Sequence, residues 1–517
     1  MRHGVFTGQR PVGTTRSRNP QRQRYTPIIV AGRGILDELS TLDAQNVTIV
    51  ERKQGNTVKV AQAFYRKTGG LFVRPQLMVR HAKDEEIWRL FFPALFALVL
   101  EPVQALIDTS IVGRIGTPQL GAVGLGTVAF QFILGFFSVF IFATTPLVAD
   151  DVSRGTNGSR ITGKGIRMAL LVGMVLQVAV MFASPHAMGF LSSDGTIAKL
   201  ADEYLEARAW GIPGALIMMV GIGASRGHKD MTAPFLGSVA YGVSLALFDT
   251  LFVLGLHTGV QGAGYSASIS QWVGAFTVMY MLYRNGTFNL KDAVDVPVAS
   301  DILPYLSMAP SLALGSAAAL APMLVSSSIV TNLGPDQLAS HTILRQISTF
   351  WIQLFMAYGA TAHSMVASSL STRTMQGMSS AAESMERICH LALITSIPLS
   401  ASLYICRSFL PILFTDNGIV NSRVETVLPM LLVCAPVDAL GLSIEGGILG
   451  AADTKWIAIR TVVSSVLSLA ALEWWAGEDG SLSIVWLCLK VLNISIVVLD
   501  LCRFMGPTTL SRSVSSR

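Results

Sequence analysis

One segment of this chain recurs in register farther along the sequence, within a series of long apolar stretches. The matched pairs, all at the same separation, are Leu205 and Leu428, Pro213 and Pro436, Gly227 and Gly450, and Asp230 and Asp453. A second repeat, with a constant separation of its own, pairs Ile115, Gly116 and Leu120 with Leu333, Gly334 and Leu338. Duplicated halves within one membrane are the usual plan of a secondary transporter, whose binding site lies between them.

The apolar stretches predict an all-α membrane protein. Of the 517 residues, 51% are hydrophobic and 14% are charged, against about 25% charged in a typical soluble domain. Long apolar runs favour helices because a helix satisfies its own backbone hydrogen bonds in lipid, and about 20 residues span a bilayer. The twelve expected transmembrane helices cover 86–112, 119–149, 163–185, 203–224, 232–255, 262–284, 303–332, 336–370, 386–407, 424–449, 456–475 and 482–504.

The distribution of basic residues predicts the orientation and the ends of the chain. Lys and Arg concentrate in alternate loops, on the side of the Arg-rich N-terminus, so both termini should face the cytosol, or the stroma or matrix of an organelle. The net charge of +6 arises there and does not indicate nucleic-acid binding. The first acidic residue is Asp37, and an Arg-rich, acid-free start is typical of an organellar transit peptide. A disordered cytosolic arm is the alternative.

These patterns divide the chain into five parts. They are an N-terminal extension at 1–85, comprising the transit peptide and a disordered linker, a first lobe at 86–284, an inter-lobe linker at 285–302, a second lobe at 303–505 and a tail at 506–517. The five cysteines have no CxxC spacing and indicate small apolar residues instead of metal ligands. No P-loop, HExxH or GxSxG motif occurs, so we expect no enzyme activity, no cofactor and no metal.

Two carboxylates in the first apolar stretch are candidates for ion coupling. Glu101 and Asp108 are seven residues apart, which is two helical turns, so they share one face with Gln104 between them. Pro102 should kink the helix beside them. Charged side chains inside a membrane are costly and usually functional. The alternative for Asp108 is a structural hydrogen bond near the helix end, because Arg114 follows shortly.

Three further acids lie in later apolar stretches. Asp249 and Asp438 are candidates for proton or cation binding if each faces the cavity of its own half. The structural alternatives are an inter-helix hydrogen bond for Asp249 and a helix-kink contact for Asp438. Glu445 is seven residues beyond Asp438 and therefore on the same face. We expect the buried Lys490 to pair within the bundle or to extend toward the interface.

Basic residues also occur near the expected cavity. His341 and Arg345 are one turn apart and could present a basic face to an anionic substrate. The segments Arg226 to Asp230 and Gly450 to Asp453 end equivalent helices. A glycine followed by polar residues is typical of a tight turn after a helix, so we interpret both segments as structural.

Several segments together resemble a known family. Ile107 to Gly116, followed by Leu120 to Thr127, is similar to the opening of the multidrug and toxic compound extrusion (MATE) transporters, in particular the DinF-like and plant plastid branch. The resemblance covers about 86–504. Its other parts are Thr144 to Ala149, Tyr204 and Leu205 with Arg208, Gly211 and Pro213, Arg226 and Gly227 with Asp230, and Leu338 to His341.

The resemblance implies twelve transmembrane helices in two pseudo-symmetric six-helix lobes that open alternately to either side. Such proteins export organic cations, drugs or organic acids in exchange for protons or sodium. The helix-1 coupling aspartate of the family falls on Asp108 and its helix-5 acid on Asp249, while the helix-10 cation-site aspartate of another branch falls on Asp438. Helix 303–332 lacks the glutamate that several branches carry. The expected cavity residues are Gln104, Gln131, His341, Arg345 and Glu445.

The leading hypothesis is therefore a proton-coupled antiporter of a small organic solute, monomeric and embedded in the plastid envelope. Sodium coupling is the nearest alternative, and a mitochondrial inner or plasma membrane is the alternative location. A lipid-linked glycan flippase would need a lateral basic groove and often extra helices. A channel or scaffold would not need paired acids inside the membrane, each of which costs about 2–3 kcal/mol or more.

Overall fold

The computed structural model describes residues 81–191, 195–294, 299–414, 417–476 and 481–505. Most of the expected N-terminal extension and the C-terminal tail lie outside these residues. The described elements are all helical. In chain order they are α2 (Asp84–Val112), α3 (Thr117–Phe136), α4 (Val139–Ser153), α5 (Ser159–Leu191), α6 (Gly195–Ala209), α7 (Ile212–Gly227), α8 (Thr232–Asp249), the π-helix η4 (Thr250–Gly255), α9 (Gly259–Arg284), the short 3₁₀ helix η5 (Leu290–Val294), α10 (Ala299–Asn332), α11 (Pro335–Ser371), α12 (Met375–Ile405), the 3₁₀ turn η6 (Pro411–Leu413), α13 (Gly418–Gly450), α14 (Thr454–Trp475) and α15 (Leu482–Met505).

Each of the twelve expected ranges falls on a helix, and three of them are interrupted. The range 119–149 is divided into α3 and α4, which meet at Phe137 and Ser138. The range 203–224 combines the end of α6 with α7, and the two helices are bent by 53°. Pro213 lies in the first turn of α7, where its missing N–H is not needed. The range 232–255 changes from α-helix to π-helix after Asp249.

Nine helical stretches of the described chain are long and apolar enough to cross a membrane, and ten if α6 and α7 form one bent span. The long helices α9 and α11 are not among them because both carry more polar residues. Their polar side chains face neighbouring helices: the Ser268 hydroxyl in α9 donates to the Ala207 carbonyl at 2.8 Å, and His341 and His363 in α11 are buried.

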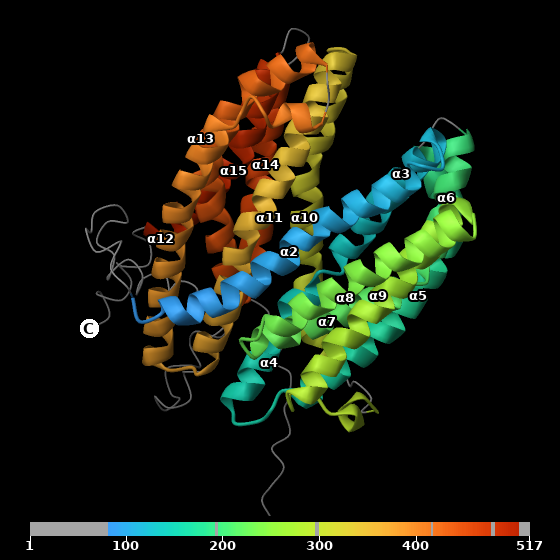
Figure 1. Ribbon diagram of the computed structural model, residues 1–517. Helices are drawn as coiled ribbons and strands as arrows, with labels where there is room; N and C mark the ends of the chain where they lie inside the picture. The colour runs from blue at the N-terminus through green and yellow to red at the C-terminus, as the bar shows by residue number, and fades with distance from the viewer. Residues whose placement is uncertain (1–80, 192–194, 295–298, 415–416, 477–480, 506–517) are drawn as a thin grey trace, which may run out of the picture. The chain divides into compact units, whose positions relative to one another are not determined.

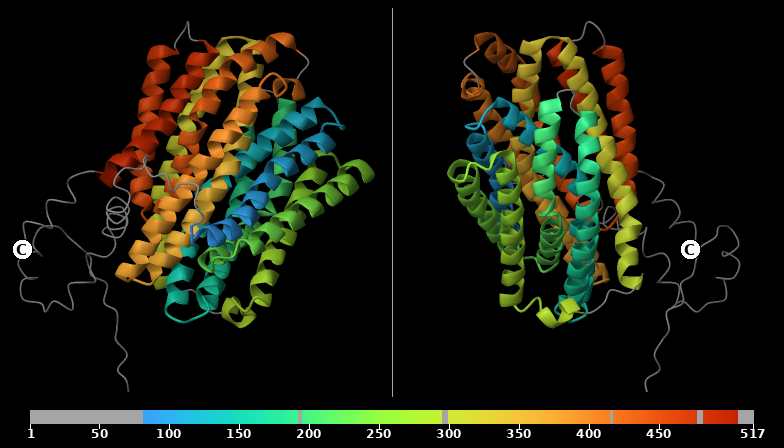
Figure 2. Two further views of the ribbon diagram at one scale, coloured as in Figure 1. Left: turned by 60° about the vertical axis from the view of Figure 1, so that its left-hand side comes forward. Right: turned by 90° about the vertical axis from the view of Figure 1, so that its right-hand side faces the viewer.

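Helices of each half of the sequence pack mainly on helices of the same half. In the first half (84–284), α5 contacts α6 and α7, α4 contacts α7, and α8 contacts α9. In the second half (299–505), α11 and α12 contact α13, and α10 and α15 contact α14. The yellow-to-red helices of the second half run alongside one another in Figures 1 and 2. Helix α2 contacts both α8 and α11, so it joins the two halves (Figure 1).

The sequence repeat corresponds to a repeated backbone contact. A Cβ atom on Gly223 would lie 2.8 Å from the Ile141 carbonyl oxygen in α4, and one on Gly446, the equivalent position of the first repeat, would collide with the Gly359 backbone in α11. One turn farther on, Gly227 and Gly450 meet the backbone of the same two partner helices. Glycine is therefore required in both halves because α7 approaches α4, and α13 approaches α11, without room for a side chain.

The turns that follow these glycines are repeated too. Lys229 and Ala452, which the first repeat also makes equivalent, have φ angles of 55° and 59°, the left-handed conformation that ends many helices. The second repeat is visible at helix starts: Gly116 (φ 154°) and Gly334 (φ 107°) precede α3 and α11, and each of these helices has a proline in its first turn. The duplication read from the sequence is therefore a duplication of local structure.

Polar contacts between the halves gather at the end that carries the basic loops. The Arg387 guanidinium donates to both oxygens of Asp84 at 2.6 and 2.8 Å, and Arg373 does the same to Asp150. Lys164 pairs with Asp301 at 2.8 Å. These contacts join α2, α4 and α5 to the second half at one end of the helices.

Candidate functional site

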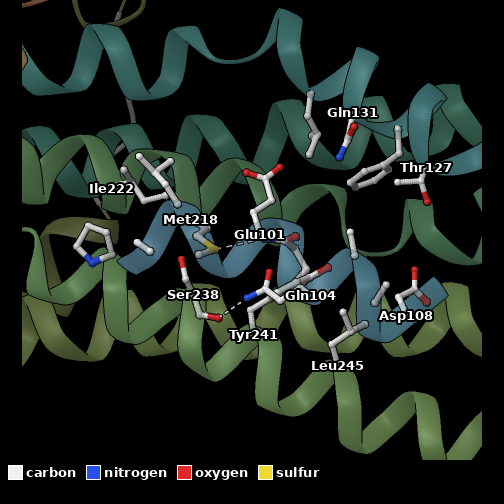
Figure 3. A pocket seen from close by; sticks show the side chains of 18 of the residues that line it. Glu101, Gln104, Asp108, Thr127, Gln131, Met218, Ile222, Ser238, Tyr241 and Leu245 are labelled. Atoms are coloured by element: carbon white, nitrogen blue, oxygen red, sulfur yellow. Dashed lines mark hydrogen bonds between the residues drawn. The ribbon is translucent and has the colours of Figure 1, made fainter. Parts of the chain in front are cut away.

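A cavity of about 720 Å³ lies among the helices of the first half and reaches α11 of the second. It is lined by residues of α2, α3, α4, α6, α7, α8 and α9, while Met356 and Ala360 supply the α11 side. Figure 3 shows Glu101, Gln104 and Asp108 in succession along α2, and all three line the cavity. Glu101 and Asp108 thus line the same cavity, in agreement with their seven-residue spacing.

The polar side chains of α2 contact different helices. The Gln104 amide donates to the Ser238 carbonyl in α8 at 2.8 Å (Figure 3), which holds this side chain against the cavity wall. Glu101 accepts a hydrogen bond from the Gln353 amide in α11 at 3.0 Å. Gln131, from α3, lines the same cavity. Glu101 therefore contacts the second half, whereas Gln104 and Gln131 belong to the first.

Asp108 and Asp249 form the centre of the site together with Arg208. The Asp249 side chain is fully buried, with the Ser266 hydroxyl and the Asp108 carboxyl as polar neighbours, and neither of its carboxylate oxygens makes a well-aligned hydrogen bond among the described residues. One oxygen of Asp108 is likewise buried without a donor. The two carboxyl groups are close enough to interact electrostatically with each other and with Arg208. Two acids and one guanidinium therefore share a small volume.

Aromatic side chains position Arg208. Its guanidinium lies 4.2 Å from the centre of the Phe130 ring and donates to the Tyr241 hydroxyl at 3.3 Å. Both rings line the cavity, as does Tyr204, whose hydroxyl is 3.1 Å from that of Thr127. A cation over an aromatic face is stabilised by the ring quadrupole. The arginine is thus held beside Asp108 without being neutralised by a bidentate ion pair among the described residues.

The backbone is irregular directly after Asp249. Helix α8 ends there and η4 continues as a π-helix over Thr250–Gly255. Such wide turns are uncommon, and they occur frequently at functional sites because they change the direction of neighbouring side chains. The irregular turn here coincides with the most deeply buried acid of the cluster.

The acids expected in the second half are paired with cations. The Lys490 ammonium donates to Asp438 at 2.6 Å, and the Asn493 amide donates to the other Asp438 oxygen at 2.8 Å. The expectation that Lys490 pairs within the bundle is thereby confirmed. Glu445 accepts a hydrogen bond from Arg460 at 2.9 Å. Neither Asp438 nor Glu445 lines the cavity, because each points toward the later helices α14 and α15 of its own half.

His341 and Arg345 also lie outside the cavity lining, contrary to our expectation. The His341 ring is buried against Trp486 of α15, with ring centres 5.4 Å apart, and its Nε2 is 3.4 Å from the Ser327 hydroxyl. Arg345 is exposed. Helix α11 is long, and only its later turns reach the cavity, at Met356 and Ala360. The early turns that carry His341 and Arg345 pack within the second half.

A family model named MatE matches residues 93–249 and 310–474, which is more than half of the chain. The two matched segments fall on the two halves described above. The chain belongs to the MatE family. It is a MATE transporter and a multi-pass membrane protein, as the sequence resemblance predicted.

Curated relatives place this MatE protein in the plastid and DinF branch. It is 28% identical over 399 residues to Protein DETOXIFICATION 44, chloroplastic, of Arabidopsis thaliana. The aligned region covers 74% of this chain and 75% of that protein. It is 24% identical over 223 residues to DNA damage-inducible protein F of Escherichia coli strain K12, covering 41% of this chain and 48% of the relative.

Solved structures agree with the fold. The chain is similar to a crystal structure of MATE in complex with MaL6, with a TM-score of 0.75 and 20% identity, covering 84% of this chain and 99% of that one. An outward-facing MATE family transporter of the MOP superfamily gives a TM-score of 0.75 at 19% identity, with coverage of 84% and 98%. These similarities support the helical MatE fold.

Two arginines of the MatE cavity were not among the cavity residues expected from sequence. Arg208, which stood out in the sequence only within the family resemblance, lies beside Asp108. Arg226 was interpreted as part of a turn, yet its side chain lines the cavity. The available signal was periodicity: Met218, Ile222 and Arg226 are four residues apart, and all three lie on the cavity face of α7.

Proposed function

We propose that this MatE protein is a secondary antiporter that exports an organic solute in exchange for protons by alternating access. In this proposal the chain crosses the membrane twelve times, in two six-helix lobes that correspond to the two halves of the sequence. The repeated glycine contacts and turns support the lobes, because the same local structure recurs in each half. The polar helices α9 and α11 would span as members of the bundle, with their polar faces buried.

The observation that carries the proposal is the pair Asp108 and Asp249. A buried carboxylate without a hydrogen-bond donor is costly, and binding of a proton removes that cost by making the group neutral. Because the two groups interact, one proton changes the charge of the whole cluster. Protonation from one side of the membrane and release to the other would then be coupled to solute movement through the adjoining cavity.

Sodium coupling is the alternative, and the surroundings favour a proton. Arg208 already places a positive charge beside Asp108, and its repulsion disfavours binding of a metal cation there. In the second half, Lys490 already occupies Asp438 as its counter-ion.

The proposed location is the plastid envelope. The chloroplastic names of two relatives and the Arg-rich, acid-free start of the chain support it. Imaging a fluorescent fusion at the C-terminus, with and without residues 1–80, tests this proposal. Plastid signal only with those residues present is the expected result, and signal at another membrane with the full chain contradicts it.

The antiport proposal is tested with the full chain in proteoliposomes under an imposed pH gradient. The solutes are tetraphenylphosphonium and benzoate, and the variants are Asp108→Asn and Asp249→Asn. Glu206→Gln is the matched control, because it also removes a carboxylate from the first half, at an exposed position of α6. We expect gradient-driven efflux of a solute by the wild type and the control, and none by either aspartate variant.

A sodium gradient without a pH difference separates the two coupling ions. Proton antiport predicts no efflux under the sodium gradient. Efflux driven by sodium alone, or undiminished proton-driven efflux in both aspartate variants, would overturn the proposed mechanism.

A further inference from the structure

At one end of the cavity lies a partly buried guanidinium without a carboxylate partner among the described residues. Arg226, in the last turn of α7, lines the cavity, and its Nε is buried without a hydrogen-bond partner. Within the part of the chain that the structure describes, no carboxylate pairs with this side chain. A charge held partly away from water without a partner is destabilising, so the unpaired guanidinium requires an explanation.

The imidazole of His363, from the other half of the protein, lies close to this guanidinium. His363, in α11, is 1% exposed, and neither ring nitrogen has a hydrogen-bond partner among the described residues. The ring interacts electrostatically with Arg226. His363 lies one turn beyond Ala360 on the same side of α11, directly behind the residues that line the cavity.

The two groups meet where α7 and α11 are in direct contact. The Ser364 hydroxyl donates to the Arg226 carbonyl at 2.5 Å, so the backbone of α7 is held against α11 at this point. Among the described residues, the Phe142 ring of α4 packs beside the His363 ring, with 5.8 Å between the ring centres. The groups described around Arg226 and His363 are thus hydrogen-bond donors and apolar side chains. A hydrogen-bond acceptor for the guanidinium would therefore come from a ligand.

We propose that Arg226 and His363 form a binding site for the carboxylate of the transported solute. A guanidinium presents a planar fork of N–H groups that matches the two oxygens of a carboxylate, and a neutral imidazole adds one further donor. This inference rests on the proposed function only in treating the bound molecule as the transported one. Binding itself does not depend on proton coupling.

The rest of the cavity indicates the body of that solute. Between Arg226 and the acidic cluster, the α7 and α4 sides of the cavity are apolar, with Ile222, Met218 and Phe142, while Glu101 and Gln104 line the α2 side. The α7 face from Met218 to Arg226 is about 12 Å long at 1.5 Å per residue. An amphipathic carboxylic acid therefore fits the site, with its carboxylate at Arg226 and its apolar body along α7. The cluster of Asp108 and Asp249 would lie beyond its apolar end.

Equilibrium binding of radiolabelled benzoate to the purified full-length protein, without any gradient, tests the site. Benzamide has the same shape without the charge. The variants are Arg226→Met, Arg226→Lys and His363→Gln, and Arg284→Met is the matched control because Arg284 is an exposed arginine on the same side of the protein. Thermal unfolding of each variant shows whether it is folded.

We expect wild type and R284M to bind benzoate equally and to bind benzamide much more weakly. R226M should weaken benzoate binding roughly 10- to 100-fold, because it removes hydrogen bonds to a charged group. H363Q should weaken it roughly 2- to 10-fold. R226K keeps the charge and loses the fork, so it should bind with intermediate affinity, and it replaces R226M as the test if that variant does not fold.

Three results would overturn the site even if benzoate binds. One is equal benzoate binding by wild type and a folded R226M or R226K. Another is equal binding of benzamide and benzoate. The third is displacement of benzoate by chloride at the same concentration as by unlabelled benzoate, which would identify a site for inorganic anions. Failure of antiport looks different: benzoate would bind through Arg226, but no pH gradient would move it. Conversely, wild-type export of tetraphenylphosphonium together with no benzoate binding would retain antiport and remove the anion site.

Discussion

The two halves share repeated helix contacts and turns, and they differ in the partners of their buried acids. In the first half, neither oxygen of Asp249 makes a well-aligned hydrogen bond among the described residues, and no cation pairs with it there. In the second half, Asp438 is held by Lys490 and Asn493. The sequence repeats also locate the difference: the first repeat makes Ala215 the counterpart of Asp438, and the second makes Ser326 the counterpart of Asp108. Duplication preserved the helix contacts, whereas the ionisable groups were placed independently in each half.

This difference separates two tasks. A carboxylate held at short distance by an ammonium and an amide is already neutralised, so it stabilises the second half and offers little to a mobile cation. A carboxylate without a donor can bind and release a proton. The comparison therefore assigns ion coupling to the first half and a structural ion pair to the second. Four sets of substitutions test that assignment, in order of decreasing expected effect.

The largest effect is expected at Asp249. Asp249→Asn should reduce gradient-driven efflux to the background of empty liposomes, because an amide cannot carry the coupling proton. The double variant Asp438→Asn with Lys490→Met should retain most of the transport, since it removes both members of the pair in the second half. Initial rates of efflux measure both. Transport by D249N together with loss in the double variant would exchange the roles of the two halves.

Removing Lys490 alone should chiefly affect stability. Lys490→Met leaves the buried Asp438 carboxylate without its ammonium, and breaking a buried pair in this way costs about 3–5 kcal/mol. The midpoint of thermal unfolding in detergent should fall clearly, and adding Asp438→Asn should restore most of it. An unchanged midpoint in K490M would show that the pair does not hold the second half together.

The repeated glycines should give smaller losses of stability, similar in the two halves. Gly446→Ala places a methyl group against the Gly359 backbone, and Gly223→Ala places one against the Ile141 carbonyl. Overpacking of this kind typically costs about 1–3 kcal/mol. Gly189→Ala is the control, because a Cβ there meets no atom within 4 Å. Thermal unfolding should rank both variants below this control; equal stability of all three would contradict the close contact.

The smallest effect is expected at the ion pair between Arg373 and Asp150, which joins the halves. Both side chains are partly exposed, at 48% and 28%, and exposed pairs contribute about 0–1 kcal/mol. Arg373→Gln should therefore change the unfolding midpoint far less than K490M does. A loss as large as that of K490M would mean that contacts between the halves matter as much as the buried pair within one of them.

Helix positions and the shared face of Glu101 and Asp108 could be predicted from sequence, because both follow from local periodicity. The break at Phe137 and Ser138 could not, since no proline marks it. Whether a side chain reaches the cavity depends on the rotation of its helix against distant neighbours. That is why Arg226 was interpreted as a turn residue, while His341 was expected in a cavity that it does not line.

The close contacts at Gly223 and Gly446 limit which parts of the protein can move. A helix that touches its neighbour backbone to backbone cannot slide along it, because the next turn would bring a side chain into the space of a hydrogen atom. The pairs α4–α7 and α11–α13 should therefore behave as rigid bodies. Movement of these rigid pairs against each other would then involve the contacts between the halves made by long, rotatable side chains, such as Arg373 with Asp150 and Arg387 with Asp84.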